Sequence, residues 1–444
     1  MTIFRRKLYN DMLRWKQSRN GKTALLIKGA RRVGKSTLVE DFARNEYETY
    51  ILIDFSHSSK RVDALFEDMM DLDLFFFQLQ NIFNVKLIER KSVIVFDEVQ
   101  LQPLARQAIK HLVKDGRYDY IETGSLLSIK RNIQNIVIPS EENKLTLNPM
   151  DFDEFLWAIG DNVTPDFLRE SFDKKRAVGD AVNRKWLRDL RLYMLIGGMP
   201  QAVETYLSTN NLQEVDFTKR DIIQLYLDDF YRIDSTGRAS QLFAAIPGQL
   251  ANNAGRYQVS SVIENQDAAR VASVVADMAD SMVVNLSYHS SDPNIGLGMT
   301  KDLNCYKMFL ADTGLFVTLA FKDKSITENI VYNRLLSDKL EANLGYVYEN
   351  LVAQMLKAAG NELFYYTFKT ESGKHNYEID FMLTKGKKIV PVEVKSSGYK
   401  THKSIDEFSK KYSSRIGERI LLYTKDYQKD GETICLPIYY AKFL

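Results

Sequence analysis

A glycine-framed loop between a strand and a helix constrains this chain more than any other feature of its sequence. Residues 29–36 read Gly-Ala-Arg-Arg-Val-Gly-Lys-Ser and match the pattern G-x-x-x-x-G-K-[S/T]. An apolar run at 24–28 precedes the loop, and a helix-forming segment at 37–45 follows it. A strand that passes through such a loop into a helix is typical of a parallel α/β sheet, so the sequence predicts an α/β fold.

The residue types of this loop suit the phosphates of a nucleotide. Small residues let backbone N–H groups surround an anion, and the positive end of the following helix points at the same place. Lys35 would reach the β- and γ-phosphate oxygens, and Ser36 would offer its hydroxyl to Mg²⁺. A glycine-containing surface turn is the alternative, but both flanks of the loop favour a site for ATP. Its expected residues are Gly29, Ala30, Arg31, Arg32, Val33, Gly34, Lys35, Ser36 and Thr37.

Two carboxylates end a second apolar run. Residues 93–96 are continuously apolar, as in a strand buried on both faces, and Asp97 and Glu98 follow directly. The carboxyl ends of parallel strands meet at one edge of the sheet, where the phosphate loop also lies. Asp97 would hold Mg²⁺ through a water, and Glu98 would orient and polarise the attacking water. Alone the pair could be ordinary loop acids; with the upstream loop it predicts ATP hydrolysis.

A hydroxyl follows another expected strand, at 118–123. Ser125 could bind the γ-phosphate or the attacking water, or it could cap the next helix, and both interpretations stay open. Further β-rich runs predict strands at 49–55 and 144–147. From 151 to about 229 the pattern is helical.

Composition excludes several classes of protein. The chain has 444 residues, 45% of them hydrophobic and 27% charged, which indicates an ordered globular protein of two to four domains. Lys and Arg (60) nearly balance Asp and Glu (58), so this is no highly basic packaging protein. Cys305 and Cys435 lie too far apart for a metal-ligand motif. The charged N-terminus resembles no signal peptide and no apolar run reaches ~18–20 residues, so we expect a cytoplasmic protein without a membrane partner.

Five segments in order carry a family resemblance. They are GARRVGKS, the VFDEVQ segment at 95–100, Thr-Gly-Ser at 123–125, NPMDFDEFL at 148–156 and Gly-Gly-Met-Pro at 197–200. This order resembles the AAA-type ATPases of bacteria and archaea that carry a long C-terminal domain of unassigned function. The resemblance implies a five-stranded core with an added strand between the two nucleotide motifs. It also implies a helical lid, with the Gly-Gly-Met-Pro turn close to the nucleotide.

The sequence departs from that family at one position. The family usually shows a Gly-Arg pair just before the fifth strand, whereas residues 139–142 here read Pro-Ser-Glu-Glu. The arginine expected to act on the γ-phosphate is therefore missing from its usual place. Arg131, at the end of the preceding predicted helix, is the substitute, and slow intrinsic hydrolysis is expected without such a group.

Three segments near the C-terminus form a second pattern. Residues 377–383 alternate, which places Asp380 opposite the apolar face of a strand, and the strand at 389–395 puts Glu393 and Lys395 on one face. Glu349 lies at the edge of the apolar face of a helix expected at 344–359. This arrangement resembles the PD-(D/E)XK nuclease superfamily. The resemblance implies Mg²⁺ or Mn²⁺ at Glu349, Asp380 and Glu393, with Lys395 positioning the attacking water; the alternative is a surface row of charges.

A basic stretch adjoins this pattern. Residues 385–415 hold nine Lys or Arg against three Asp or Glu, interleaved with Tyr399, Phe408 and Tyr412. Such a stretch suits a polyanion, although a solvated lysine-rich face fits equally well.

These patterns predict four parts. They are a P-loop AAA-type core with a parallel sheet (1–150), a helical lid (151–237), a winged-helix-like module (238–300) and an α/β restriction-endonuclease-like domain (301–444). The expected function is ATP hydrolysis coupled to a nuclease-like domain that acts on DNA. The alternatives are a nucleotide-switched DNA-binding protein with an inert nuclease fold, and a signalling ATPase without a nucleic-acid partner. A homo-oligomer is compatible with each.

Overall fold

The computed structural model describes residues 2–125, 140–252, 255–263, 268–322, 344–370, 373, 375–398 and 401–444. It divides the chain into two compact units. Unit 1 holds Met1–Asn148 with Asp280–Met282, and unit 2 holds Pro149–Ala279 with Val283–Leu444.

Unit 1 is built on a five-stranded sheet in which every pairing is parallel. Its strands are β1 (Ala24–Lys28), β2 (Thr49–Asp54), β3 (Ser92–Asp97), β4 (Asp119–Gly124) and β5 (Glu142–Thr146). They lie in the order β2-β3-β4-β1-β5, so the strand between the two nucleotide motifs is added outside β3. Each predicted strand is confirmed to within two residues.

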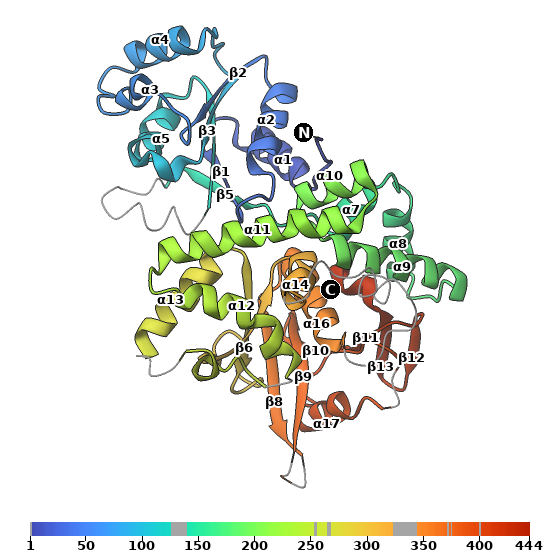
Figure 1. The fold of residues 1–444 in the computed structure, drawn as a ribbon. Helices are drawn as coiled ribbons and strands as arrows, with labels where there is room; N and C mark the ends of the chain where they lie inside the picture. The colour runs from blue at the N-terminus through green and yellow to red at the C-terminus, as the bar shows by residue number, and fades with distance from the viewer. Residues whose placement is uncertain are drawn as a thin grey trace. The chain divides into compact units, whose positions relative to one another are not determined.

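Helices cover both faces of this sheet (Figure 1). They are α1 (Leu8–Arg19), α2 (Lys35–Glu46), α3 (Lys60–Ala64), α4 (Leu72–Phe83) and α5 (Pro103–Asp115). Because strand residues alternate between faces, Ile94 and Phe96 of β3 enter one core with Phe66, Phe75 and Phe76 beneath α3–α5. All six residues of β3 are buried, as the apolar run predicts for a central strand.

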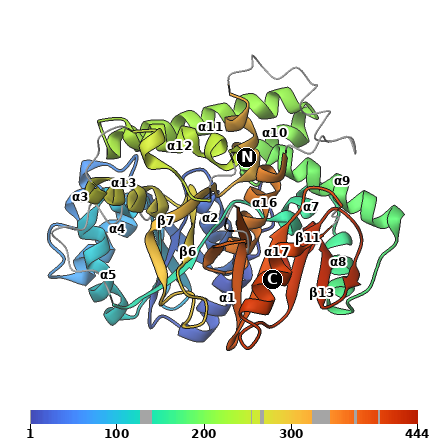
Figure 2. The same cartoon turned by 90° about the horizontal axis from the view of Figure 1, so that it is seen from below.

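Unit 2 contains a mixed eight-stranded sheet in the order β12-β13-β11-β10-β9-β8-β6-β7 (Figure 2). Strands β6 and β7 stand at one end, and β11 and β13 lie toward the other. The predicted boundary at 300/301 falls between two adjacent strands of this sheet, and the four-part division stays a prediction. The bounds are β6 (Val284–Ser290), β7 (Lys301–Leu310), β8 (Leu363–Lys369), β9 (Asn376–Lys385), β10 (Lys388–Val394), β11 (Arg419–Tyr423), β12 (Gln428–Asp430) and β13 (Thr433–Pro437).

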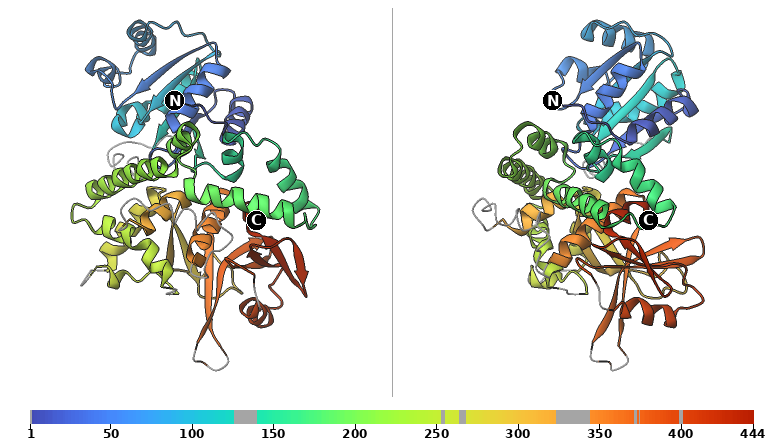
Figure 3. Two further views of the ribbon diagram at one scale, coloured as in Figure 1. Left: turned by 45° about the vertical axis from the view of Figure 1, so that its right-hand side comes forward. Right: turned by 90° about the vertical axis from the view of Figure 1, so that its right-hand side faces the viewer.

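Helices make up the rest of unit 2. The all-helical pattern predicted from 151 to 229 is confirmed by α7 (Phe152–Ala158), α8 (Thr164–Asp173), α9 (Asp180–Ile196), α10 (Pro200–Thr209) and α11 (Leu212–Ile233). Later helices include α12 (Arg238–Ala251), α13 (Ala268–Asp280), α14 (Thr313–Ala320), α16 (Gly345–Ala358) and α17 (Lys403–Lys411). Helix α16 packs on β6, β7, β8 and β10, and α17 lies along the long β8–β9 hairpin (Figure 3).

The Gly-Gly-Met-Pro turn is held by a buried aspartate. Asp312 is 2% exposed, and its carboxylate accepts hydrogen bonds from the backbone N–H groups of Gly198 (2.5 Å) and Leu315 (2.8 Å). Beside it the fully buried Lys219 donates to the carbonyl oxygens of Leu195 (2.5 Å) and Gly314 (3.2 Å). Helices α9, α10, α11 and α14 therefore meet at this turn. That the turn also lies close to a nucleotide stays a prediction.

Hydrogen bonds join the predicted lid helices to the C-terminal part of unit 2. The Gln354 amide of α16 donates to the Tyr193 hydroxyl of α9 (2.8 Å), and the Tyr439 hydroxyl donates to Asn183 (2.9 Å). Lys442 pairs with Asp153 of α7. Helices of 151–237 are therefore bonded to α16 and to the short helix Ile438–Phe443 of the C-terminal part.

We predict that Gly198→Ala destabilises the protein by roughly 1–3 kcal/mol, the usual cost of overpacking. A Cβ at this position would lie 2.1 Å from the backbone oxygen of Met150, which cannot move aside like a flexible side chain. Urea denaturation measures the effect. Gly248→Ala in α12 is the matched control, because no atom lies within 4 Å of its Cβ position. Equal midpoints for Gly198→Ala and the wild type would contradict the prediction.

Candidate functional site

The predicted phosphate loop lies between β1 and α2. Gly34 caps α2 with a φ of 91°, and Arg32 also has a positive φ of 69°. A Cβ at Gly29 would come within 2.4 Å of the Leu147 backbone oxygen, so the close approach of β5 requires glycine there. Val33 is buried, whereas Arg31 and Arg32 are exposed. The loop therefore exposes the side chains of Arg31 and Arg32 and packs the Val33 side chain into the protein interior.

The Lys35 side chain is buried within this loop. It is 5% exposed, and its ammonium donates to the carbonyl oxygens of Gly29 (3.2 Å) and Ala30 (3.0 Å). Burial lowers the pKa of Lys35, and the negative charges of Glu98 and Asp97 oppose that shift. A lysine held this way has its charge at the centre of the loop, where phosphate oxygens would be bound.

Asp97 receives hydroxyl groups from two neighbouring elements. The Ser36 hydroxyl of α2 donates to Asp97 Oδ1 (2.9 Å), and the Thr123 hydroxyl of β4 donates to the same oxygen. Burial raises the pKa of Asp97, while these two hydrogen bonds lower it. The structure therefore brings together Ser36 and Asp97, the two predicted Mg²⁺ ligands of the loop. Hydroxyl and carboxylate oxygens are the ligand types that Mg²⁺ prefers.

Glu98 follows in a left-handed conformation, with a φ of 54°. Its N–H donates to the Thr123 hydroxyl (3.2 Å), and its carboxylate accepts from the side-chain amide of Gln100. From β4 it is the Thr123 hydroxyl that contacts the acidic pair, two positions before the predicted Ser125, whose role stays a prediction. Periodicity could have indicated Thr123, because it ends a strand beside the carboxylates.

Arg6, which no sequence motif indicated, supports the loop from the N-terminal segment. Its guanidinium is buried and donates to the carbonyl oxygens of Val33 (2.9 Å) and Asn148 (2.6 Å). One side chain thereby joins the phosphate loop to the end of β5. No local pattern identifies Arg6 among its charged neighbours. The substitute arginine, Arg131, lies outside the described residues.

A buried ion pair occupies the place where the family usually shows Gly-Arg. Glu142, the first residue of β5, accepts two hydrogen bonds from Arg106 of α5 (2.9 and 3.1 Å), and both side chains are almost fully buried. Glu122 of β4 lies beside them and is 0% exposed. Burial, followed by the charge of Glu142, raises the pKa of Glu122 to about 8, and Arg106 opposes the shift. Arg106 therefore hydrogen-bonds Glu142, and its positive charge also favours the ionised form of Glu122.

The C-terminal pattern also comes together in space. Asp380 of β9 accepts from the Val394 N–H of β10 (2.7 Å), and Lys395 donates to Glu393 Oε1 at 2.5 Å. The other oxygen of Glu393 is buried without a hydrogen-bond partner in the structure. Asp380, Glu393 and Lys395 therefore meet where the antiparallel strands β9 and β10 adjoin.

Glu349 of α16 reaches this place together with two residues that the sequence analysis missed. Lys307 of β7 lies 3.6 Å from Glu349 and forms an ion pair with Glu378 of β9. Burial, and next the negative charges of Glu349 and Glu378, raise the pKa of Asp380 well above its usual range. These six residues, Lys307, Glu349, Glu378, Asp380, Glu393 and Lys395, are called the acidic site below.

No group of three or more His, Cys, Asp or Glu side chains has the geometry to hold a metal ion within the part of the chain that the structure describes. The divalent ion at Glu349, Asp380 and Glu393 therefore stays a prediction.

Two aromatic residues of the basic stretch at 385–415 are part of a hydrophobic core. Phe408 of α17 and Tyr412 are buried in one core with Tyr366 of β8, so these aromatic rings do not face solvent. Lys411 lies over the rim of that core, 5.2 Å from the Tyr412 ring centroid. Tyr399 lies outside the described residues. Phe408 and Tyr412 stabilise the packing of α17.

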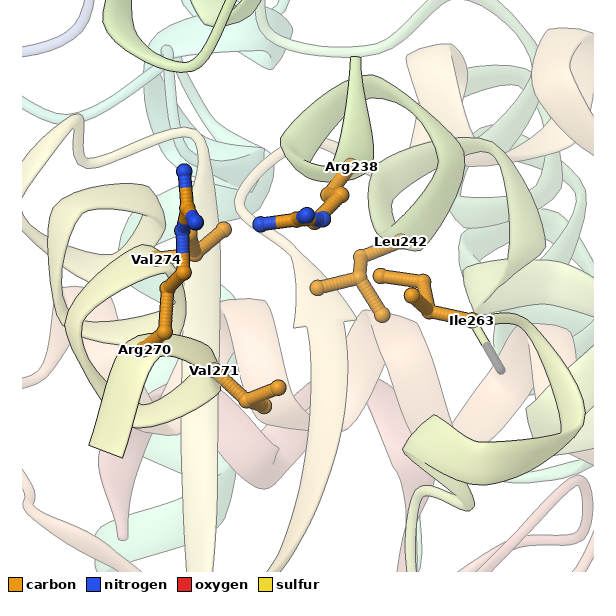
Figure 4. Close-up of a pocket in the computed structure, with 6 residues that line it drawn as sticks. All are labelled: Arg238, Leu242, Ile263, Arg270, Val271 and Val274. Atoms are coloured by element: carbon orange, nitrogen blue, oxygen red, sulfur yellow. The ribbon is translucent and has the colours of Figure 1, made fainter. Parts of the chain in front are cut away.

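A small pocket lies between α12 and α13 (Figure 4). Its empty space of about 180 Å³ is below the ~300 Å³ of typical ligand pockets, so a nucleotide does not fit. The winged-helix-like interpretation of 238–300 stays a prediction. The lining residues are Arg238, Leu242, Ile263, Arg270, Val271 and Val274.

Family comparison agrees with the first of these sites. Residues 21–156 match the family model of an AAA domain, and this span contains the phosphate loop and the acidic pair. This match supports an AAA-type P-loop ATPase domain in this part of the chain. The AAA domain implies nucleotide binding. Residues 187–325 and 344–441 match models of two domains of unknown function, DUF8612 and DUF4143.

Three solved structures illustrate the weak similarity that a structural comparison found. The Aeropyrum pernix Orc1 protein in complex with DNA is 13% identical, with a TM-score of 0.30 and coverage of 72% of this chain and 93% of that chain. Caenorhabditis elegans PCH-2 is 14% identical, with a TM-score of 0.28 and coverage of 47% and 65%. A Pyrococcus horikoshii signal transduction ATPase with a tetratricopeptide repeat sensor is 11% identical, with a TM-score of 0.28 and coverage of 80% and 48%.

A comparison with curated protein sequences found no match. Among the described residues, every helix is too short or too polar to cross a bilayer.

We predict that Glu122→Gln removes a pH-dependent loss of stability. The pKa of Glu122 is raised to about 8, so this side chain keeps a proton in the folded protein that it loses near pH 4.5 in the unfolded chain. The free energy of unfolding therefore falls as pH rises between these two values. The melting temperature of the wild type should therefore drop more than that of Glu122→Gln between pH 5 and pH 8.5, by roughly 3 °C or more. Calorimetry measures this, with exposed Glu40→Gln as control. Parallel pH profiles for Glu122→Gln and the wild type would contradict it.

Proposed function

We propose that the protein hydrolyses ATP with Mg²⁺ in its AAA domain, and that the nucleotide controls a metal-dependent nuclease-like site in its C-terminal part that acts on DNA. The observation that carries the first half is the convergence of Lys35, Ser36, Asp97 and Glu98 at the carboxyl edge of one parallel sheet. Phosphoryl transfer needs little more than positioning and charge, and these residues supply both.

Each of these residues has a separate role. Lys35 binds the β- and γ-phosphate oxygens, and the N–H groups of the loop surround the phosphates. Ser36, and Asp97 through a water, would hold Mg²⁺, which would supply positive charge beside the phosphates. Glu98 orients the attacking water, and Gln100 fixes the direction of its carboxylate. The Thr123 hydroxyl donates to Asp97 and accepts from the Glu98 N–H, so it positions both acidic residues.

We expect Lys35→Ala to abolish ATP hydrolysis and weaken ATP binding strongly, because it removes the charge at the centre of the loop. Glu98→Gln should bind ATP with Mg²⁺ normally and hydrolyse it at least ~100-fold more slowly, the usual contribution of a general base. Phosphate release and fluorescent-nucleotide titration measure the two effects. Lys91→Ala, an exposed lysine paired with Glu48, is the control. Wild-type turnover in Glu98→Gln would refute this assignment.

The acidic site supports the second half of the proposal. Asp380 and Glu393 present carboxylates on adjoining strands, Glu349 adds a third from α16, and Lys395 lies beside Glu393. Phosphodiester hydrolysis uses carboxylates to hold a divalent ion and a lysine to position water. The unpartnered, buried oxygen of Glu393 fits an ion ligand, because buried carboxylate oxygens normally have a partner.

The alternatives differ in what the acidic site does. In one, the site keeps its fold and binds DNA without cutting it; in the other, the protein has no nucleic-acid partner. DNA binding that weakens steeply with salt would favour the nuclease and the inert DNA-binding module over a protein without a nucleic-acid partner, because phosphate contacts release counterions. Metal-dependent cleavage separates the nuclease from the inert module.

We expect Asp380→Ala and Lys395→Ala to abolish cleavage of DNA in the presence of Mn²⁺ and ATP, while ATP hydrolysis stays at the wild-type rate. Single-stranded, duplex and branched DNA are the substrates, and Glu432→Ala, an exposed acid, is the control. Calorimetry should detect Mn²⁺ binding that Asp380→Ala removes. Mn²⁺ binding that survives in Asp380→Ala would show that the site is misassigned. Binding without cleavage of any substrate would establish the inert module.

A further inference from the structure

Lys307 is an unusual residue for its position. It lies in β7 within the run Tyr306-Lys307-Met308-Phe309-Leu310, whose other members are buried hydrophobic residues, and it is itself only 6% exposed. Lysine is almost never buried unless a partner compensates for its charge. Its partners therefore explain why the strand places a lysine there.

Those partners are carboxylates of the acidic site. Glu378 of β9 forms an ion pair with the Lys307 ammonium, and Glu349 of α16 lies 3.6 Å from it. These two acids, together with Asp380, raise the pKa of Lys307, against the effect of burial. The ammonium therefore stays charged between elements that are far apart in the sequence.

The charges in this place divide into two groups. Lys395 is engaged with Glu393 at 2.5 Å, on the β10 side. Lys307 is the cation that faces Glu349 and Glu378. Among the described residues no other cation forms an ion pair with Glu349 or Glu378, so loss of Lys307 would leave these partly buried acids uncompensated, which destabilises a fold.

We propose that Lys307 is the resident cation of the acidic site, taking the place of a divalent ion between Glu349 and Glu378. The domain then holds these carboxylates together in the absence of metal. A divalent ion then binds chiefly at the edge formed by Asp380 and Glu393, where one Glu393 oxygen is buried without a hydrogen-bond partner. Only the placement of that ion rests on the proposed nuclease-like function; the role of Lys307 in the metal-free protein does not.

The test compares thermal unfolding of Lys307→Met in EDTA and in Mn²⁺. Methionine keeps the length of the side chain and removes its charge. In EDTA, Lys307→Met should melt roughly 5–10 °C below the wild type, as expected when one partner of a buried ion pair is lost. Mn²⁺ should raise its melting temperature by more than it raises that of the wild type, because the ion can replace the missing ammonium.

A second variant separates charge from packing. Lys307→Met/Glu378→Gln removes one acid along with the lysine and should recover most of the lost stability in EDTA. Lys301→Met, on the same strand but paired with the exposed Glu362, is the control and should melt like the wild type in both buffers. If Lys307→Met does not fold, the double variant decides: a folded double variant supports the role of Lys307, and an unfolded one overturns it.

Three results would overturn the inference. The first is a Lys307→Met protein as stable in EDTA as the wild type, and the second is failure of Glu378→Gln to restore stability. The third is an equal Mn²⁺ shift in Lys307→Met and the wild type, which would reject replacement of a metal ion. Mn²⁺ binding unaffected by Asp380→Ala would instead refute the nuclease-like function, and the EDTA comparison would still stand. The two proposals therefore fail separately.

Discussion

One carboxylate oxygen ties the nucleotide site together. Asp97 Oδ1 accepts a hydrogen bond from Ser36 at the start of α2 and another from Thr123 at the end of β4. These contacts exist only because β1, β3 and β4 run parallel, so that their carboxyl ends meet at one edge. The phosphate loop, the acidic pair and the hydroxyl of β4 are thus consequences of one sheet order.

Buried charges organise both units in the same way. In unit 1, Arg106 serves Glu142 and lies beside Glu122; in unit 2, Lys307 pairs with acids from two other elements. Each set joins segments distant in sequence, and in each a cation lies beside more than one carboxyl group. Breaking one partner of such a set costs more than the pair contributes, because the remaining charge stays buried. Such sets impose specific positions on the helices and strands that carry them.

A second junction decides the architecture of unit 2. Asp312 binds the backbone of Gly198 and caps α14, while Lys219 fastens α11 to the same turn. The Gly-Gly-Met-Pro segment needs glycine there because Met150 and Asp312 approach its backbone closely. The helices predicted as a lid are consequently bonded to α14 and α16 of the C-terminal part.

The sequence by itself determined the elements whose signals are local. The strands of unit 1, the helix that begins at Lys35 and the fully buried β3 follow from apolar periodicity and from the spacing of Gly29, Gly34 and Lys35. Strand alternation also placed Asp380 with Glu393 and Lys395. Only the tertiary structure decided which distant residue completes each site, such as Arg6 at the phosphate loop and Lys307 at the acidic site. Their partners lie on other elements, and local periodicity carries no information about charges that meet only after the chain has folded.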